Sequence, residues 1–249
     1  MAAAEPTKSP VEQAGEDLFN FAIEREDTKW LVARLPAESE VNPATVEYEL
    51  QILKIISVGW SIPYFLADWP EKQRLIELFW QAVREFSGSL STTTEMMTGQ
   101  DIDYFQTLKE RLDGYLDALQ RHPEAKEPSE VIGAEFARVC GDADDIFAAF
   151  TGGRMFSTTT TRVREYLDAE AARIVVILCR CGANPIEEPP AAAELCQAVA
   201  RLPGVCAAHW IDRLCTTEGW DQVPGLVAGH SANRVLLGIC NPYLFIGPL

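Results

Sequence analysis

The spacing of apolar residues changes abruptly near residue 170, and this change constrains the fold more than any single motif does. Upstream, apolar side chains recur every three or four residues, as they do in amphipathic helices. Downstream, residues 174–178 form an unbroken, β-branched apolar run, which is typical of a strand buried on both faces. The pattern predicts a flexible N-terminus over residues 1–10, an all-helical domain over residues 11–169 and a separate α/β module over residues 170–249.

The helical region contains several start and stop signals. Asn42 followed by Pro43 is typical of a helix start, because asparagine caps free amides and proline suits the first turn. Asp101 is the expected cap of a later helix, and Pro63 is an expected break. An interruption at residues 151–153, which include two glycines, should separate the last two helices. Short connections between the helices predict an antiparallel bundle or array.

A group of carboxylates, formed by Asp142, Asp144 and Asp145, lies between two predicted helices. Such a group can bind a metal, but it contains no histidine and lies where a helix begins, so we expect it to cap that helix. The threonine run at residues 158–161 is likewise expected in a cap or a loop. No nucleophile and base are paired in this region, so the sequence predicts no catalytic site there.

The formal net charge of −16 is unevenly distributed along the chain. From Glu170 onward there are five Arg, no Lys and seven Asp or Glu, so most of the negative charge belongs to the helical region. An acidic surface repels phosphate backbones, so we expect no nucleic-acid partner but a protein partner with a basic face. No apolar run approaches the ~20 residues that span a bilayer. Because the first residues also lack the order of a secretory signal, we expect a cytoplasmic protein with no membrane span.

The module after residue 170 is predicted to alternate strands with helices. Strands are expected at residues 174–178, 204–211 and 235–239. The first helix should begin at Pro190 and turn its apolar residues inward, namely Leu195, Val199 and Leu202. The second helix, over residues 218–229, should bury Trp220, Val223 and Val227. Right-handed crossovers then give a small three-stranded parallel α/β module of Rossmann-like type, following the all-α bundle.

Six of the seven cysteines lie at or after residue 179. In a reducing compartment, such density favours metal or redox chemistry over disulfides. Four of these cysteines lie at or just beyond the ends of predicted strands: Cys179, Cys181, Cys215 and Cys240. We expect them to converge, because the carboxyl ends of parallel strands meet at one edge, where helix amino termini stabilise thiolates. The predicted site is one all-cysteine iron–sulfur cluster, with 4Fe–4S favoured over 2Fe–2S.

Several alternatives to this cluster remain open. Zinc also takes four thiolates, although its structural sites usually contain C-x₂-C pairs and this sequence has none. The cysteines can instead be inert packing residues, which is the role expected of Cys196 and Cys206. A histidine such as His209 can replace one thiolate, as in Rieske-type clusters. Finally, Cys179 and Cys181 can form a redox pair, although they lack the usual C-x-x-C spacing.

The cysteines belong to a longer pattern of short motifs in a fixed order. The motifs are C-R-C-G-A-N from Cys179, L-P-G-V from Leu202, L-C-T-T-E-G from Leu214, N-R-V from Asn233 and C-N-P from Cys240. Together they resemble the N-terminal domain of the flavin-containing subunit of heterodisulfide reductase, which has a C-x-C-G after its first strand and an N-R-V strand ending in Cys-x-Pro. The resemblance does not extend to residues 11–169.

This resemblance implies an iron–sulfur cluster on Cys179, Cys181, Cys215 and Cys240, within a protein that transfers electrons. The domain of that family leads into a flavin-binding domain with a G-x-G-x-x-G fingerprint, which is absent from this sequence, so we expect no flavin in this chain. We therefore expect an accessory subunit without independent catalysis, docked to a larger flavin or iron–sulfur redox subunit. The alternative is a non-catalytic binding or assembly adaptor with a zinc-bound or metal-free cysteine module.

Overall fold

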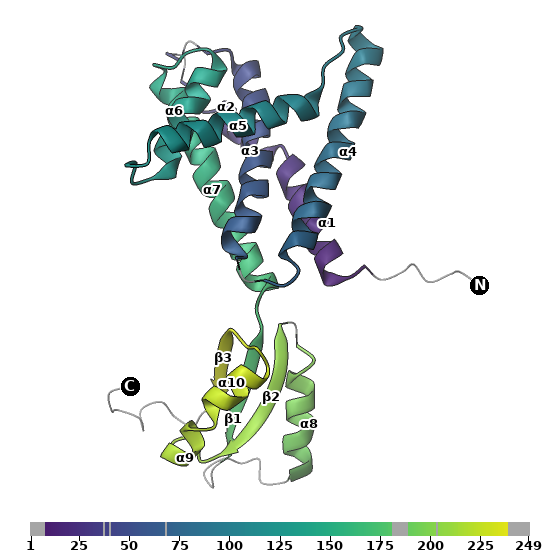
Figure 1. The fold of residues 1–249 in the computed structure, drawn as a ribbon, viewed down its shortest axis with the longest axis vertical. Coiled ribbons are helices and arrows are strands. Elements are labelled where there is room, and N and C mark those ends of the chain that lie inside the picture. The colour runs from purple at the N-terminus through teal and green to yellow at the C-terminus, as the bar shows by residue number, and fades with distance from the viewer. Residues whose placement is uncertain are drawn as a thin grey trace, which may run out of the picture. The chain divides into compact units, whose positions relative to one another are not determined.

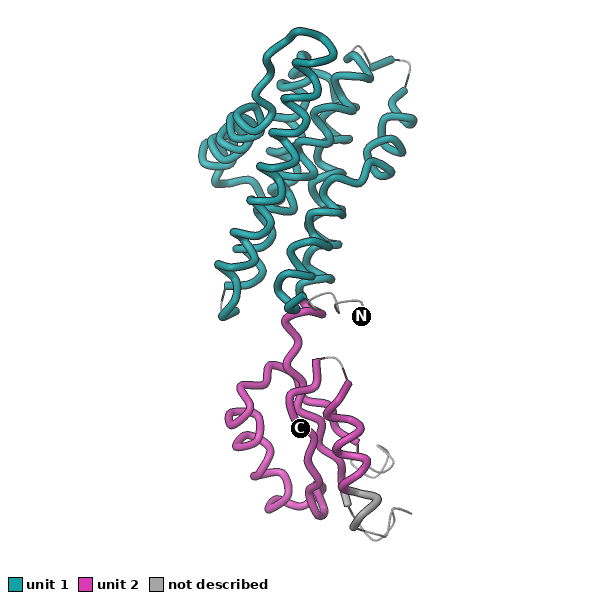
Figure 2. Tube along the Cα trace, turned by 90° about the vertical axis from the view of Figure 1, so that its right-hand side faces the viewer, with its two compact units in different colours: residues 1–167 teal, residues 168–249 magenta. Residues whose placement is uncertain are grey.

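A computed structural model of the chain describes residues 8–36, 38–39, 41–67, 69–180, 189–202 and 204–238. The chain divides into two compact units, residues 1–167 and residues 168–249 (Figure 2). The first unit is helical, and the second contains a small parallel sheet, so the predicted fold class is confirmed. Within the described ranges, no helix combines the length and the apolar character needed to cross a membrane.

In the first unit, all the regular secondary structure of the described residues is helical (Figure 1). Its helices are α1 (Pro10–Ile23), α2 (Glu26–Val32), α3 (Pro43–Phe65), α4 (Lys72–Thr98), α5 (Tyr104–Arg121), α6 (Pro128–Cys140) and α7 (Ile146–Glu170). The predicted start of α3 is confirmed, because the Ala44 amide donates to the Asn42 side chain over 2.8 Å. The predicted cap at Asp101 is wrong by two residues. Asp103 caps α5 instead, accepting a 2.9 Å hydrogen bond from the Gln106 amide.

Helix α3 forms the centre of this unit, since it packs against α1, α2, α4, α5 and α6. It is buried around most of its circumference and carries two buried charged side chains, Glu49 and Lys54. Arg111 of α5 donates two hydrogen bonds of 2.9 and 2.8 Å to the Glu49 carboxylate. Lys54 Nζ donates to the Asp27 carboxylate over 3.0 Å. These partners compensate for the desolvation of the buried charges and tie α3 to its neighbours.

Pro63 does not end α3 as predicted, because the helix continues to Phe65. The last turn still closes, since the Leu66 amide donates to the Ile62 carbonyl oxygen over 3.2 Å. A proline so close to the end of a helix therefore removes a hydrogen bond without interrupting the turn that follows.

The interruption predicted at residues 151–153 is also absent, because α7 runs through both glycines. These glycines allow α6 and α7 to approach closely. A Cβ atom on Gly152 would meet the Phe136 side chain at 2.5 Å, and one on Gly153 would meet the Ser129 carbonyl oxygen at 2.7 Å. The threonine run at residues 158–161, expected in a cap or loop, lies within α7 as well. Three of its hydroxyls donate to carbonyl oxygens in the preceding turn, and that of Thr159 donates to the Met155 sulfur.

The second unit alternates strands with helices, as predicted. Its elements are β1 (Ile174–Arg180), α8 (Pro189–Val199), β2 (Val205–Asp212), α9 (Thr217–Trp220), α10 (Val223–Gly229) and β3 (Arg234–Gly238). The strands are parallel in the order β2–β1–β3, with β1 at the centre. Right-handed crossovers in this order place α8 and α10 on opposite faces of the sheet (Figure 1).

The core of this unit lies between the sheet and α10. Val175, Ile177 and Cys179 of β1 pack there with Ala207 and Ile211 of β2 and with Val223 of α10. Leu226 and Val227 of α10 complete the layer.

Two details of the predicted burial in this unit are wrong. Leu202 and Trp220 are 56% and 46% exposed, although both were expected to face inward. Leu202 lies beyond the end of α8, and Trp220 ends the short helix α9. The predicted helix over residues 218–229 is therefore two shorter helices, and the second has Pro224 in its first turn.

The close approach of α6 and α7 leads to a stability prediction. Gly153→Ala should lower the free energy of unfolding by about 1–3 kcal/mol, because its methyl group would overlap the Ser129 carbonyl oxygen. The matched control is Gly88→Ala in α4, where no atom lies within 4 Å of the added methyl group. It should instead raise stability by about 0.4–1 kcal/mol. Urea unfolding followed by circular dichroism measures both, and equal stabilisation by the two variants would contradict the close helix contact.

Candidate functional site

The carboxyl ends of the three parallel strands form one edge of the second unit. The register pairs Arg180 with Asp212 and Leu178 with Gly238, so the described strands end within two residues of one another. Ligands of open α/β sheets bind at this edge, because the loops that follow the strands converge there. The four thiols are expected from the sequence to meet at this same edge.

Cys179 is the second-to-last residue of β1 and lies at this edge. It pairs in register with Ile211, and its side chain is only 2% exposed. The surrounding core residues include Leu214 and Val223, which belong to the β2–α9 turn and to α10. Cys179 therefore faces the α10 side of the sheet, in an apolar environment.

Cys215 lies in the turn that follows β2 and is exposed. The turn is held by the Thr216 hydroxyl, which donates to the Arg213 carbonyl oxygen over 3.0 Å and accepts from the Gly219 amide over 3.2 Å. Arg213 adopts a positive φ of 52°. A Cβ atom on Gly219 would lie 2.9 Å from the Leu214 Cα, so only glycine fits this turn. The turn thus holds Cys215 directly before Thr216, the N-cap of α9, at the same edge as Cys179.

The other two predicted ligands, Cys181 and Cys240, lie outside the described residues. In the chain, Cys181 follows the last residue of β1, and Cys240 comes two residues after the last residue of β3. Among the described residues, no three His, Cys, Asp or Glu side chains gather in a group that could hold a metal ion. The structure therefore places two of the four thiols at one edge of the sheet.

The remaining cysteines lie elsewhere. Cys206 is near the start of β2, at the opposite edge, where its thiol donates to the Ile174 carbonyl oxygen over 3.3 Å. Because it is exposed, its expected role as a core residue is wrong. Cys196 is partly buried near the end of α8, which leads toward the start of β2, and burial raises its pKa. In the helical unit, burial and then the nearby Glu49 carboxylate raise the pKa of Cys140 to about 12, so its thiol stays protonated.

A histidine pair in the second unit was not predicted from the sequence. His209 of β2 and His230, at the end of α10, place their Nε2 atoms 2.9 Å apart, with ring centroids separated by 5.0 Å. Burial, and then the neighbouring His230, lower the pKa of His209. His209 is in register with Ile177, and its Nε2 bonds to His230. No local motif announces such a pair, since the two residues are far apart in the sequence.

The acidic group of the helical unit has the capping role that was predicted. Asp145 Oδ1 accepts hydrogen bonds of 2.8 Å from the amides of Phe147 and Ala148, in the first turn of α7. The Asp142 carboxylate accepts a 2.9 Å hydrogen bond from the Asp144 amide. The carboxylates thus satisfy free backbone amides at a helix start.

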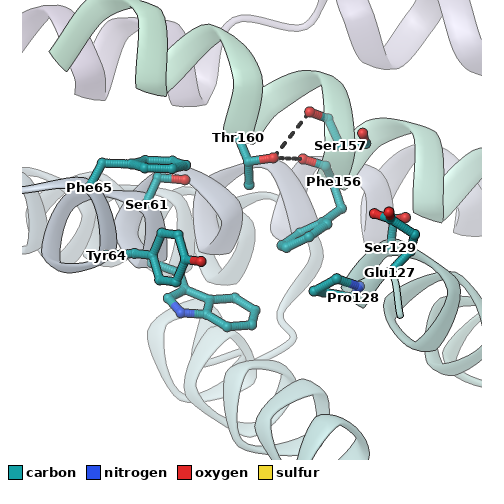
Figure 3. Close-up of a pocket in the computed structure, with 10 residues that line it drawn as sticks. Ser61, Tyr64, Phe65, Glu127, Pro128, Ser129, Phe156, Ser157 and Thr160 are labelled. Atoms are coloured by element: carbon teal, nitrogen blue, oxygen red, sulfur yellow. Dashed lines mark hydrogen bonds between the residues drawn. The ribbon is translucent and has the colours of Figure 1, made fainter. Parts of the chain in front are cut away.

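The helical unit also contains an aromatic pocket of about 230 Å³ between α3, the start of α6 and α7 (Figure 3). Trp60, Tyr64 and Phe65 of α3 lie on one side, and Phe156 of α7 lies on the other. Glu127, directly before α6, also lines the pocket. Helical spacing predicted Trp60 on a buried face, and no prediction was made for Phe156. Aromatic residues at helical spacing indicate a core equally well, so the sequence carries no separate signal for the pocket.

Known proteins offer no match to this chain. A scan against protein-family models, a search of curated proteins and a search of solved structures each found none. Any assignment of function therefore depends on the residues themselves.

The histidine pair predicts that the second unit loses stability in acid. A lowered histidine pKa means that the unfolded chain binds protons more readily than the folded one, so stability falls as the pH drops below about 6.5. His209→Gln should remove this loss, because it removes the group whose pKa is lowered. Urea unfolding at a series of pH values, followed through NMR signals of β2, measures it. His122→Gln, a change at an exposed histidine of the helical unit, is the control. An unchanged pH dependence in His209→Gln would contradict the prediction.

Proposed function

We propose that the second unit holds one iron–sulfur cluster at the carboxyl edge of its sheet, and that the chain is an accessory electron-transfer subunit of a larger, heterodisulfide-reductase-like redox complex. The observation that supports this proposal is the segregation of the thiols. Cys179 and Cys215 lie at that edge, whereas Cys206 lies at the opposite edge. In the chain, Cys181 and Cys240 closely follow the strands that end at the same edge.

The described part of the site suits a cluster in two respects. Cys179 supplies a thiol from an apolar wall, and such a wall excludes water and lowers the local dielectric constant. Cys215 supplies an exposed thiol from a turn whose backbone is held by hydrogen bonds. When bound, a cluster accepts and donates single electrons, with a potential set by such surroundings. The residues of this chain would hold it and shield one of its sides, and they catalyse no reaction of their own.

A single one-electron centre requires a redox partner close by, and the charge of the chain indicates its nature. Most of the net charge of −16 belongs to the helical region, so a partner with a basic face would dock there most readily. With no flavin fingerprint in the sequence, we propose that a larger flavin or iron–sulfur protein in the cytoplasm supplies or receives the electrons.

The alternative function is a binding or assembly adaptor whose cysteine module holds zinc or no metal. The aromatic pocket of the helical unit favours this alternative, because an electron-transfer role does not require it. The metal content of the protein separates the two functions.

Single cysteine variants test the cluster most cleanly at the exposed positions. In anaerobically purified protein, Cys215→Ala should lose most of its iron and acid-labile sulfide, because a ligand is removed. It should cost little packing energy, since the side chain is exposed. The matched control is Cys206→Ala, which removes another exposed thiol from the same unit and should retain its iron. Full iron in Cys215→Ala, equal loss in both variants, or zinc in place of iron in the unmodified protein would overturn the proposal.

A further inference from the structure

The residues that line the aromatic pocket of the helical unit favour one class of ligand, independently of any cluster in the second unit. We propose that the pocket binds an arginine side chain presented by a basic segment of a partner protein. The proposal rests on the aromatic walls, the hydrogen bonding of two pocket hydroxyls and one carboxylate that lines the pocket.

The walls of the pocket consist mainly of aromatic rings. The rings of Trp60 and Phe156 lie 5.6 Å apart at 45°, and those of Tyr64 and Phe65 lie 5.0 Å apart at 85°. Tyr64 is 72% exposed, so a large aromatic side chain remains in solvent beside the pocket. Ring faces carry a partial negative charge that attracts cations, and arginine in particular stacks on them.

Two of the hydroxyl groups that line the pocket already donate their protons to backbone carbonyl oxygens. Ser61 Oγ donates to the Ser57 carbonyl oxygen over 2.7 Å. Thr160 Oγ1 donates to the carbonyl oxygens of Phe156 and Ser157 over 2.9 and 3.0 Å (Figure 3). These two hydroxyls have only lone pairs left to offer a ligand, so they would accept hydrogen bonds from donors such as a guanidinium group.

Glu127 is the one charged residue among those lining the described pocket. It precedes the first turn of α6, but its side chain makes no capping hydrogen bond. Its carboxylate forms no ion pair with any described residue. A guanidinium group can bond a carboxylate through two parallel N–H groups while its plane stacks on a ring. An arginine side chain can therefore stack on the aromatic rings and bond to the Glu127 carboxylate at the same time.

The helical unit already uses this type of contact. The guanidinium carbon of Arg164 lies 5.9 Å from the centroid of the Phe65 ring. Three other rings of the unit, those of Phe21, Trp30 and Phe105, also lie close to cationic side chains. The proposed ligand would make the same contact from a second protein.

The size of the pocket points to a side chain as the occupant. Its volume of about 230 Å³ is below the roughly 300–1,000 Å³ of pockets that enclose whole drug-sized ligands. One arginine side chain suits this space, and the acidic charge of the helical region favours a basic segment around it. We therefore assign the pocket to a protein partner.

Titration of the full-length protein with N-acetyl-arginine amide tests the chemistry directly. The NMR signal of the Trp60 indole N–H, assigned by its loss in Trp60→Phe, should shift in a saturable manner. N-acetyl-citrulline amide, which has nearly the same shape but no charge, should bind at least ten-fold more weakly, because it loses both cation–π attraction and the carboxylate pair. A basic peptide containing one arginine should bind more tightly than the amide alone. Equal binding of the peptide and the amide would indicate a site for a small guanidinium compound and overturn the assignment to a protein.

Matched variants at exposed positions locate the site without disturbing the fold. Glu127→Gln should weaken binding of the arginine amide at least three-fold and reduce its sensitivity to salt. Glu130→Gln, a change at an exposed carboxylate in the first turn of α6 outside the pocket, should leave binding unchanged. Equal weakening by the two variants, equal affinity for citrulline, or an unmoved Trp60 signal would overturn the proposal. None of these measurements depends on the iron content of the protein. A negative result for the pocket would therefore leave the cluster proposal intact, and the reverse also holds.

Discussion

The two hydrogen-bonded ladders of β1 are the interaction on which the second unit depends. β1 pairs in parallel with β2 on one side and with β3 on the other, and its residues Val175, Ile177 and Cys179 face the core. Parallel pairing on both sides aligns the three strand ends at one edge. The same alignment separates the cysteines, because a thiol near the end of a strand and one near its start lie at opposite edges. The proposed cluster site is thus a consequence of strand direction.

The helical unit depends on a comparable constraint at α3, which is buried along most of its length and carries buried charges. Glu49 and Lys54 require partners from α5 and from α2, so the neighbouring helices cannot rotate freely about α3. Close contact between α6 and α7 at Gly152 and Gly153 adds a second restraint. Ser129 of α6, which lines the aromatic pocket, also takes part in the close contact with Gly153.

Local sequence patterns predicted the helices and strands of this fold well. They did not predict contacts between residues that lie far apart in the sequence. The apolar run at the start of the second unit predicted β1, and the Asn42–Pro43 pair predicted the start of α3. Both predictions succeeded because strand propensity and helix capping act within a few residues. Pro63 and the glycines of α7 were misleading signals, since tertiary packing decides whether a helix continues through them. The histidine pair and the pocket arise from residues on different elements, and no local signal reveals them. Two of the four predicted ligands lie at the expected edge, while Cys181 and Cys240 are outside the described residues.

The central claim is that thiols from the ends of parallel strands hold an iron–sulfur cluster. X-ray absorption at the iron edge of anaerobically purified, full-length protein tests it most directly, because the spectrum reports the identity of the ligands and of any second metal nearby. We expect iron surrounded by sulfur alone, with a further scattering shell from neighbouring iron atoms. Protein that contains no iron, or iron bound by nitrogen and oxygen without a neighbouring iron, would contradict the claim.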